Sequence, residues 1–478
     1  MRALLDLVSG AAGLPVVVLG DAVLDGWLGG PSSRLSREAP VPVVDVTVSR
    51  YAAGGAANAA VNLAAMGAQV RFVSVTGDDA DGALLRQVLA DAGVDDRDVV
   101  VQPGRATCAK RRISAGSQML TRFDTGSTGR VSEATRALVA DRLREAAAGA
   151  AAVVVSDYGL GLLGEDSVAL VASLGHPCVV VDARRPARWA AARPRAVKPN
   201  FAEVEPLLGD GLDRAERVVA AAARVREVLG AQVVAATLDG DGAVVLSDGP
   251  PVRLHTTPAP DSHAAGAGDS FTAALALALA QGASPALAGE LAQTAAQVAV
   301  RSPGTTPCGA AELREAVSRY EQRVSDLARL ADLVAGHRAR GRRVAFTNGC
   351  FDVLHAGHVA HLREARALAD VLVVGLNSDE SVRRLKGADR PVNPVEDRAA
   401  VLGGITGVDH LVVFDTDTAA ELIEAVRPDV YVKGGDYTPE MLPEAALAER
   451  LGGEVITLGW VDESATDELL DRIRAQSW

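Results

Sequence analysis

The chain is poor in aromatic residues, in cysteine and in basic tracts. Only 3% of its 478 residues are aromatic while 48% are hydrophobic, so its cores must be aliphatic. The four cysteines form no Cys-x-x-Cys pair, which favours buried thiols in a reducing cytoplasm over disulfides or zinc. A net charge of −13 without an offsetting basic tract argues against a nucleic-acid partner.

Long apolar runs are also absent. None reaches the roughly 18 residues of a membrane span, and Val16–Gly20 is expected to be a first buried strand rather than part of a signal sequence. Short apolar runs alternate with helical stretches, the pattern of parallel sheets covered by helices on both faces. The predicted strands are Pro15–Gly20, Ala151–Ser156, Cys178–Asp182, Val233–Thr237, Arg343–Thr347, Val371–Asn377 and Val430–Lys433, with helices such as Thr135–Ala147 and Ala215–Leu229.

Two regions break this α/β pattern. Pro40–Arg50 and Thr107–Phe123 alternate Val, Thr and Ile with polar residues, so we expect antiparallel strands of a small separate sheet, a lid. Ala310–Arg343 is polar and helical without a strand, and it is predicted to join two domains. The predicted organisation is a domain at 1–320, a helical connection at 321–342 and a second domain at 343–478.

The most specific motif is FTNGCFDVLHAGH at Phe346–His358. An apolar strand enters a Gly-containing turn, and His355 and His358 follow at the start of a predicted helix that ends at Leu368. Their spacing puts both imidazoles on one face of the first turn, beside free backbone N–H groups and the positive end of the helix dipole. Such a site suits a polyphosphate.

The whole string resembles the signature of nucleotidyltransferases that join a nucleoside triphosphate to a small phosphate ester and release pyrophosphate. The resemblance implies that His355 and His358 bind the triphosphate and that Lys386 neutralises charge on the substrate phosphate or pyrophosphate. It also implies nucleotide contacts from further positions in this half, namely Asn348, Gly349, Phe351, Asp352, Lys433, Gly434, Asp436, Ser464 and Thr466.

The first half has polar residues and glycines at strand ends. Asp21 and Asp25 follow the first strand, where carboxylates face the ligand crevice of an α/β sheet and accept hydrogen bonds from sugar hydroxyls. The alternative is a pair of turn aspartates. Gly54 and Gly55 allow close approach of the backbone to a ligand, with Asn58 in the first helical turn; the alternative is an ordinary glycine turn.

Two later motifs suit phosphate chemistry. Asn200 and Glu203 can hold a hydrated Mg²⁺ near phosphates, although a helix-capping arrangement explains the same spacing. Gly266-Ala267-Gly268 opens an Ala-rich helix and exposes N–H groups to the charge on a transferring phosphoryl group. Asp269 is placed to accept the proton of an attacking hydroxyl.

In this order, these features resemble the ribokinase family of ATP-dependent sugar kinases, over roughly residues 10 to 315. The resemblance implies a ribokinase-like fold, Asp269 as base, Mg²⁺ at Glu203, and a lid that covers the sugar and forms a homodimer interface. The implied sugar-binding residues are Asp21, Asp25, Gly54, Gly55, Asn58, Lys110 and Arg112. The implied nucleotide-binding residues are Asn200, Glu203, Thr237, Asp239, Gly242, Gly266, Ala267 and Gly268.

Nearly the full chain resembles the bifunctional enzymes of ADP-heptose synthesis, which fuse such a kinase to a Rossmann-like nucleotidyltransferase. The resemblance implies phosphorylation of D-glycero-β-D-manno-heptose 7-phosphate at the anomeric position. After a separate phosphatase has acted, it implies adenylyl transfer from ATP to heptose 1-phosphate. The segments that carry it are Pro31–Pro42, Gly54–Asn62, Lys110–Arg112, Ser156–Tyr158, Arg384–Gly387, Arg390–Pro394 and Lys433–Tyr437.

The chain departs from this family pattern in the first half. His263-Ala264-Ala265 stands where the kinase loop has an acid and a threonine, Lys198 replaces the threonine of Thr-Pro-Asn, and Gly159-Leu160 replaces a lysine. These departures leave two alternatives, an active nucleotidyltransferase half alone or a non-catalytic scaffold. A further alternative is a transferase that uses CTP with a small alcohol phosphate, because the sequence does not show the backbone contacts that set nucleotide preference.

Two other patterns compete with this interpretation. Gly159–Gly164 is a literal G-x-G-x-x-G followed by Asp182, as in an NAD site, but Ser156–Tyr158 makes the turn too long for that fingerprint. His355, His358 and His361 suggest zinc, yet His361 lies off the shared helix face.

Overall fold

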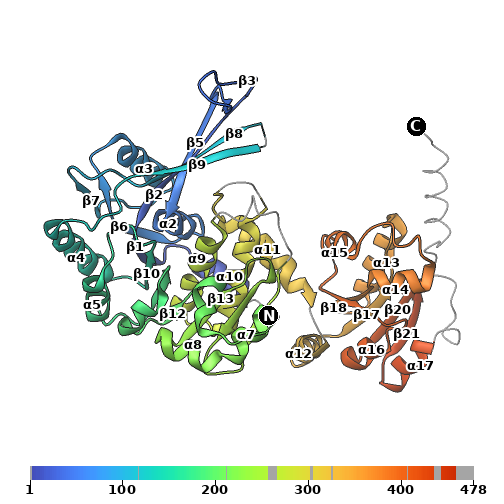
Figure 1. Ribbon diagram of the computed structural model, residues 1–478. Coiled ribbons are helices and arrows are strands. Elements are labelled where there is room, and N and C mark those ends of the chain that lie inside the picture. The colour runs from blue at the N-terminus through green and yellow to red at the C-terminus, as the bar shows by residue number, and fades with distance from the viewer. Residues whose placement is uncertain are drawn as a thin grey trace. The chain divides into compact units, whose positions relative to one another are not determined.

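The protein folds into two compact units, Arg2–Val317 and Ser318–Trp478, here called the first and second unit (Figure 1). The computed structural model describes residues 3–116, 118–211, 213–256, 266–301, 305–324, 327–405, 407–434 and 443–458. Both units are α/β, as predicted. Within the described residues, no helix is long and apolar enough to cross a membrane.

A nine-stranded sheet of order β15-β14-β13-β12-β11-β10-β1-β6-β7 forms the centre of the first unit. Strands β13 to β7 are parallel, and β14 (Ala243–Leu246) and β15 (Val252–Leu254) add an antiparallel edge that was not predicted. The parallel strands are β1 (Pro15–Gly20), β6 (Gln69–Gly77), β7 (Val99–Gln102), β10 (Ala152–Asp157), β11 (Val179–Ala183), β12 (Ala196–Val197) and β13 (Val233–Thr237). Their valine-rich sequences are buried because helices cover both faces.

On one face, side chains such as Leu143, Val171 and Leu229 pack against the central valines. The elements of this face are α4 (Glu133–Ala147), α5 (Glu165–Ser173), η1 (Pro186–Ala192), α7 (Arg214–Ala220) and α8 (Ala222–Leu229). The single helix predicted at Ala215–Leu229 is therefore two helices. The opposite layer comprises α1 (Ala3–Gly10), α2 (Ala56–Ala65), α9 (Ala267–Ala280) and α10 (Pro285–Ala299). Within it, α2 contacts β1 and α9 contacts β10 and β11.

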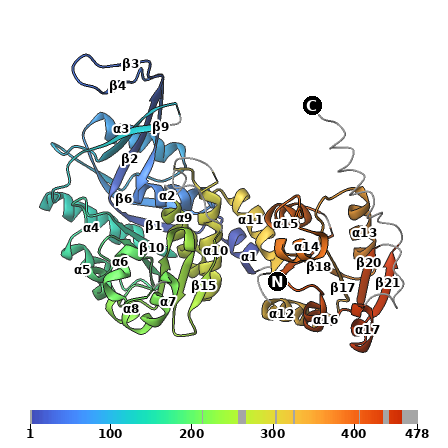
Figure 2. The same ribbon diagram turned by 45° about the vertical axis from the view of Figure 1, so that its right-hand side comes forward.

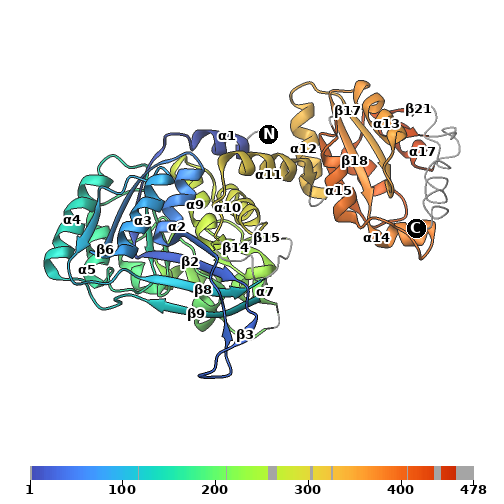
Figure 3. The same cartoon turned by 90° about the horizontal axis from the view of Figure 1, so that it is seen from above.

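The predicted lid is a four-stranded sheet of order β5-β2-β8-β9 (Figure 3). Its strands are β2 (Ala22–Gly30), β5 (Val48–Gly55), β8 (Ala109–Ala115) and β9 (Gln118–Thr125). The β2–β5 and β8–β9 pairs are antiparallel, but the central β2–β8 pair is parallel, so the prediction of a purely antiparallel lid is wrong there. A separate hairpin of β3 (Arg34–Leu35) and β4 (Pro42–Val43) projects beyond it (Figure 2).

The remaining described elements of this part of the chain are short or peripheral. They are α3 (Ala80–Asp91), α6 (Phe201–Val204), η2 (Glu205–Leu207), η3 (Asp239–Asp241) and α11 (Ala310–Gln322), which runs across the division between the units. Side-chain caps fix several helix starts: the Asp79, Ser132 and Ser284 oxygens accept backbone N–H groups of α3, α4 and α10.

A six-stranded, wholly parallel sheet of order β16-β19-β18-β17-β20-β21 forms the second unit, as the Rossmann-like prediction requires. The strands are β16 (Arg323–Val324), β17 (Val344–Gly349), β18 (Val371–Asn377), β19 (His410–Phe414), β20 (Val430–Gly434) and β21 (Glu454–Leu458). One face packs on α12 (Leu327–Arg338), α16 (Ala420–Val426) and α17 (Pro443–Arg450), and the other on α13 (Ala356–Ala367) and α15 (Val395–Gly403). Helix α14 (Asp379–Lys386) follows β18.

The stretch expected to be a strand-free connection belongs in part to this second fold. Strand β16 pairs with β19, so the prediction that Ala310–Arg343 contains no strand is wrong. Helix α12 buries Leu330 and Val334 against Phe346 of β17. Amphipathic sequence alone could not distinguish a core helix from a connecting one. The domain limits of 320 and 343 stay predictions.

Candidate active sites

Asp269 is the centre of the candidate site in the first unit. It lies in the first turn of α9 and is only 7% exposed. One carboxylate oxygen accepts a 2.6 Å hydrogen bond from the Asn58 amide, and the other accepts one of 2.9 Å from the Tyr158 hydroxyl. Burial, and next the nearby Asp182 charge, raise the pKa of Asp269 to about 6. The carboxylate is therefore ionised at neutral pH and can accept a proton.

A cavity of about 230 Å³ lies in front of this carboxylate. It sits where β10, β11 and β12 end and α9 begins, the crevice in which open α/β sheets bind ligands. Its lining residues are Asp157, Tyr158, Asp182, Arg184, Lys198, Asn200, Glu203, Gly266, Gly268 and Asp269. Carboxylates, cations and backbone amides thus meet in one pocket, which suits a polyphosphate with its counter-ion.

The glycines at the start of α9 let other groups approach the backbone closely. Gly266 has φ +88°, and a Cβ there would lie 2.9 Å from the Asn58 amide nitrogen. A Cβ on Gly268 would lie 3.1 Å from the Lys198 ammonium. Together with Ala267, these residues present the first N–H groups of the helix beside Asp269. Their role as an anion cradle stays a prediction.

Asn200 and Glu203 form a helix-capping pair. The Asn200 N–H donates to Glu203 Oε2 at 2.9 Å, and the Glu203 N–H donates to Asn200 Oδ1 at 3.0 Å, so the capping alternative describes their mutual contacts. Both still line the cavity, and burial raises the pKa of Glu203. No group of three or more His, Cys, Asp or Glu that could hold a metal occurs among the described residues. One carboxylate, water and phosphate oxygens nevertheless make the donor set Mg²⁺ prefers, so the pocket fits that ion.

Asp21 anchors the loop that follows β10. Buried at 3% exposure, its carboxylate accepts the backbone N–H groups of Tyr158 at 2.9 Å, Leu160 at 3.1 Å and Leu162 at 3.3 Å. The oxygens expected to bind sugar hydroxyls thus also hold the backbone of this loop, and their role in sugar binding stays a prediction. The same bonds occupy two of the amides within the Gly159–Gly164 motif that an NAD pyrophosphate would need.

The lid contributes an ion pair and a cation near Tyr158. Arg112 donates to Asp25 at 2.9 Å, on adjacent strands β8 and β2. Gly54 leaves room for that carboxylate, since a Cβ would lie 2.3 Å from it. Gly55 has φ +58° and precedes α2. The Lys110 ammonium lies 5.5 Å from the Tyr158 ring centre. Lys110 thus approaches Tyr158, which lines the cavity, whereas the described lining of the cavity includes none of the predicted sugar-side residues.

The predicted adenine-side residues lie around the end of β13. The Thr237 N–H donates to Pro199 O at 2.9 Å, which ties β13 to the segment before Asn200. Asp239 has φ +52°, and Gly242 has φ +88° in a turn where a Cβ would meet the Leu254 carbonyl oxygen at 2.0 Å. These three residues shape a tight turn next to the cavity rather than line it.

In the second unit, the two motif histidines use the same ring nitrogen to cap α13. His355 Nδ1 accepts the Gly357 N–H at 3.2 Å, and His358 Nδ1 accepts the His355 N–H at 3.4 Å. A backbone N–H can only donate, so a neutral ring bonded in this way carries its proton on Nε2. His355 Nε2 is buried and has no hydrogen-bond partner among the described residues, and the ring centres lie 4.1 Å apart. A phosphate oxygen would satisfy such donors.

His361 differs from the pair of His355 and His358 in its surroundings. Burial, followed by the charges of His355 and His361, lowers the pKa of His358 to about 4. His361 is buried against β17, with Nε2 3.1 Å from the Thr347 hydroxyl, and its pKa is also lowered to about 4, mainly by burial. It therefore contributes to the core rather than to the pair.

The ends of β17 and β20 bring two predicted nucleotide-binding segments together. Asn348 Oδ1 accepts the Tyr431 hydroxyl at 2.9 Å and the Lys433 ammonium at 3.1 Å. Gly349 and Gly434 end the same two strands, which are neighbours in the sheet.

Phe351 and Lys386 both lie near His358. Phe351 is buried with φ +43°, and its ring centre is 5.5 Å from that of His358. Lys386 is exposed at the end of α14, and its charge contributes to the lowered pKa of His358. Six predicted or departing positions lie outside the described residues: Asp436, Ser464 and Thr466 of the second unit, and His263, Ala264 and Ala265 of the first.

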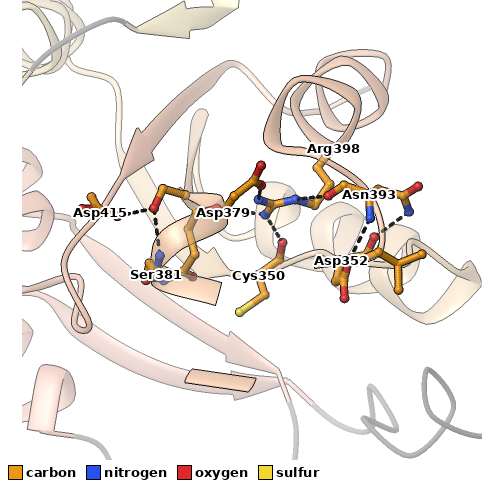
Figure 4. A network of polar contacts seen from close by, with 10 residues as sticks. Cys350, Asp352, Asp379, Ser381, Asn393, Arg398 and Asp415 are labelled. Carbon is orange, nitrogen blue, oxygen red and sulfur yellow. Dashed lines mark hydrogen bonds and ion pairs between the residues drawn. The ribbon is translucent and has the colours of Figure 1, made fainter. Parts of the chain in front are cut away.

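Asp352 holds a loop rather than facing open space. Its oxygens accept Arg390 Nη1 at 2.6 Å, the Val392 N–H at 2.6 Å and the Asn393 N–H at 3.2 Å. Figure 4 shows Asp352 next to Asn393. The carboxylate is buried at 4% exposure. Predicted as a nucleotide contact, it positions the Arg390–Asn393 segment beside the motif.

Arg398 was not predicted, yet it joins three loops of this site (Figure 4). Its side chain is 1% exposed and donates to the carbonyls of Cys350, Asn377 and Asn393, and to Asp379 at 2.7 Å. The loops that follow β17 and β18 are thereby fixed to the start of α15. An arginine inside an amphipathic helix gives no sequence signal of such burial.

The first unit also holds site residues that the sequence left unassigned. Tyr158 bonds the base directly, and Asp182 pairs with Lys198 at 2.8 Å and with the Thr272 hydroxyl at 3.0 Å. The sequence signal that could have identified them is their position. Tyr158 follows β10 and Asp182 lies at the end of β11, both at the carboxyl edge of the parallel sheet.

Comparison with known proteins agrees with this division. Residues 16–312 match the pfkB family of carbohydrate kinases, and residues 346–464 match the cytidylyltransferase-like family. The bifunctional protein HldE of Mesorhizobium japonicum is 39% identical over 97% of this chain and 96% of its own length. The chain belongs to the HldE family. HldE of Pseudomonas aeruginosa strain LESB58 is 41% identical over 96% of this chain and 97% of its own.

Solved structures share the fold of the first unit of this HldE-family protein. Arabidopsis thaliana ribokinase complexed with ribose and ATP has a TM-score of 0.52 and 21% identity, covering 64% of this chain and 99% of its own. Escherichia coli phosphofructokinase-2 in complex with substrates and products has a TM-score of 0.54 and 21% identity, covering 63% and 97%. The chain is thus a bifunctional enzyme with a sugar kinase unit and a nucleotidyltransferase unit.

Proposed function

We propose that the first unit phosphorylates D-glycero-β-D-manno-heptose 7-phosphate at its anomeric hydroxyl with ATP, and that the second unit transfers AMP from ATP to heptose 1-phosphate. The products are heptose 1,7-bisphosphate and ADP, and ADP-heptose and pyrophosphate. A separate phosphatase removes the 7-phosphate between the steps. The observation that carries the kinase half is the buried Asp269, held by Asn58 and Tyr158 at the mouth of a cation- and amide-lined cavity.

In the proposed kinase reaction, Asp269 accepts the hydroxyl proton as the sugar oxygen attacks the γ-phosphorus of ATP. The amides of Gly266–Gly268 face the charge on the phosphoryl group. Asp25, Asn58, Lys110 and Arg112 contact the sugar phosphate, and Asp21 positions the loop that carries Tyr158.

Mg²⁺ is the proposed divalent ion of this site. Glu203, which lines the cavity, would bind it through water, and the ATP phosphates would supply further oxygens. The ion would offset phosphate charge during transfer. Titrating Mg²⁺ against Glu203→Gln should show a raised metal requirement, and an unchanged titration would remove Glu203 from the metal site.

In the proposed adenylyl transfer, the sugar phosphate attacks the α-phosphorus in line, and no covalent enzyme intermediate forms. The Nε2–H groups of His355 and His358 donate to triphosphate oxygens, and Lys386 and Lys433 add positive charge. The observation that favours this role is His355 Nε2, a buried donor for which the described part of the chain provides no partner.

The decisive experiment supplies each substrate separately. Purified protein is incubated with Mg²⁺, ATP and either heptose 7-phosphate or heptose 1-phosphate, and the products are identified by mass spectrometry. Heptose bisphosphate in the first reaction and ADP-heptose in the second are expected. A product only in the second would leave the alternative in which the nucleotidyltransferase half alone is active.

A second candidate concerns the nucleotide of the second unit. The likeness of residues 346–464 to the cytidylyltransferase-like family favours a test of CTP with an alcohol phosphate such as glycerol 3-phosphate. Equal mixtures of ATP and CTP with each acceptor should yield only ADP-heptose. CDP-glycerol as the main product would replace the adenylyl assignment.

We further propose a cytoplasmic homodimer formed through the lid. The lid and its hairpin expose apolar side chains, including Leu35, Val41, Val48, Met119 and Phe123. A second copy of the same surface would cover them. Light scattering should give twice the chain mass of 49.2 kDa, and Met119→Glu together with Phe123→Glu should give monomers. A monomeric wild-type protein would refute this interface.

A further inference from the structure

Lys198 is a departure from the resembled kinase family that the structure places inside the candidate site. It follows β12 and stands where the family has the threonine of Thr-Pro-Asn. Although it is a lysine, it is only 7% exposed. Lysines are almost never so buried without a charged partner, and here Asp182 provides one, 2.8 Å from Nζ.

The ammonium group also lies against the anion cradle. A Cβ added to Gly268 would stand 3.1 Å from Nζ, so the charge sits beside the first N–H groups of α9. Lys198, Gly266, Gly268 and Asp269 all line the same cavity of about 230 Å³. A phosphoryl group that reaches both the cradle and Asp269 would therefore meet this ammonium.

We propose that Lys198 is a catalytic residue of the first unit whose ammonium group contacts the phosphoryl group in transfer. This inference rests on the kinase function proposed above. A bond forms between the sugar oxygen and the γ-phosphorus, and the bond from that phosphorus to the bridging oxygen breaks, its electron pair leaving with ADP. The hydroxyl proton goes to Asp269, while Lys198 keeps its protons and supplies positive charge.

A simpler role for Lys198 would be to neutralise Asp182. The two roles differ in a double-mutant cycle. If Lys198 only balances Asp182, then Asp182→Asn should restore activity to Lys198→Met, because no carboxylate is left unpaired. If Lys198 acts on the phosphoryl group, the double variant should stay as slow as Lys198→Met.

The experiment measures kcat and KM for ATP with heptose 7-phosphate in the full-length chain. Lys198→Met and Lys198→Thr should lower kcat by about 10²-fold, comparable to the loss of one oxyanion donor, with little change in KM for ATP. Lys198→Arg, which keeps the charge, should retain more activity than either. Adenylyl transfer by the second unit, measured on the same samples, should be unchanged.

Each outcome decides the inference. Lys198→Thr, which restores the family residue, keeps the site polar if Lys198→Met does not fold. Wild-type rates in Lys198→Thr, or recovery in the double variant, would overturn the role of Lys198 while leaving the kinase function in place. A wild-type chain without phosphoryl transfer would overturn both.

Discussion

The two candidate sites are assembled in opposite ways. In the first unit, Asn58 and Tyr158 bond Asp269 from 211 and 111 residues away along the chain. In the second, the bonds that orient His355 and His358 join residues two and three positions apart. A site made by one strand, turn and helix can be recognised from a short string. A site gathered at a sheet edge leaves only scattered polar residues in the sequence.

The sites also differ in the charge they present. The first concentrates carboxylates, and burial with Asp182 raises the pKa of its base to about 6. In the second, burial lowers the pKa of His358 to about 4, so that ring is a neutral donor. A group that accepts a proton and groups that bind a polyanion therefore need opposite local electrostatics. A substitution in one site should change the activity of that unit and leave the other activity unchanged.

Removal of α12 should have the largest effect on the second unit. A fragment of residues 318–478 keeps β16 and α12 and should transfer adenylyl groups like the full chain. A fragment of residues 343–478 exposes the Phe346 face that Leu330 and Val334 cover, so it should be insoluble or inactive. Circular dichroism and turnover measure both. Full activity of the shorter fragment would show that residues 321–342 only connect the two domains, as first predicted.

Asp269→Asn should lower the kinase rate by about 10²–10⁴-fold, since it keeps the shape but removes the base. Its hydrogen bonds with Asn58 and Tyr158 must rearrange, so thermal unfolding is recorded as a control. Adenylyl transfer should stay within error. Equal loss of both activities would show that the sites are coupled.

Each of His355→Ala and His358→Ala should lower kcat of adenylyl transfer by about 10²–10³-fold, by analogy with one oxyanion donor. His361→Ala is the matched control: it loses the Thr347 contact and should cost about 1 kcal/mol of stability with kcat little changed. Kinase activity should not respond to any of them. If His361→Ala were as damaging to kcat, or if zinc restored a chelated enzyme, a metal site would replace the phosphate site.

The kinase and adenylyl transfer activities should also differ in their pH dependence. Asp269 acts as a base only when ionised, and its pKa is raised to about 6. Kinase kcat/KM should therefore fall about tenfold per pH unit below 6 and level off above it. Adenylyl transfer should show no inflection from His358, whose pKa of about 4 keeps it neutral over this range. A kinase profile that stays flat down to pH 5 would contradict Asp269 as the base.

Arg398→Met should affect stability rather than chemistry alone. Removing this buried cation breaks its bonds to three carbonyls and Asp379. We expect the second unit to lose about 3 kcal/mol and to unfold at a lower temperature, with the first unit's transition unchanged. Arg363→Met, at an exposed position of α13, is the control. Equal unfolding temperatures for both variants would show that the network adds little.

The fold was predictable to the extent that local pattern decides it. Strands β1, β13 and β18 begin and end where the valine-rich runs do. Asp21 follows the predicted first strand, and the motif of His355 and His358 follows the predicted strand that became β17. What failed depends on tertiary partners. The parallel pairing of β2 with β8, the membership of α12 in a core, and the burial of Arg398 arise from contacts between distant segments.

The same distinction applies within the sites. His355 and His358 could be predicted because their geometry follows from helix spacing. The position of Asp269 was predicted from its glycine loop, but its partner Tyr158 and the Asp182–Lys198 pair were not, since three separate strands bring them together. Asp21 and Asp352 have buried carboxylates bonded to loops, which composition cannot tell from ligand-facing ones.

The anchoring of the loop after β10 by Asp21 has a consequence for how this enzyme can evolve. The loop is held through the main-chain N–H groups of residues 158, 160 and 162, a donor that every amino acid except proline provides. Its path also needs the glycines at 159 and 161, which have φ +69° and φ +97°, because a Cβ on Gly161 would lie 2.2 Å from the Gly129 carbonyl oxygen. Because Asp21 accepts only the backbone N–H of residue 160, the exchange of the family's lysine for Gly159-Leu160 keeps this anchor, so evolution can replace the side chain at 160 more readily than Asp21 or Gly161.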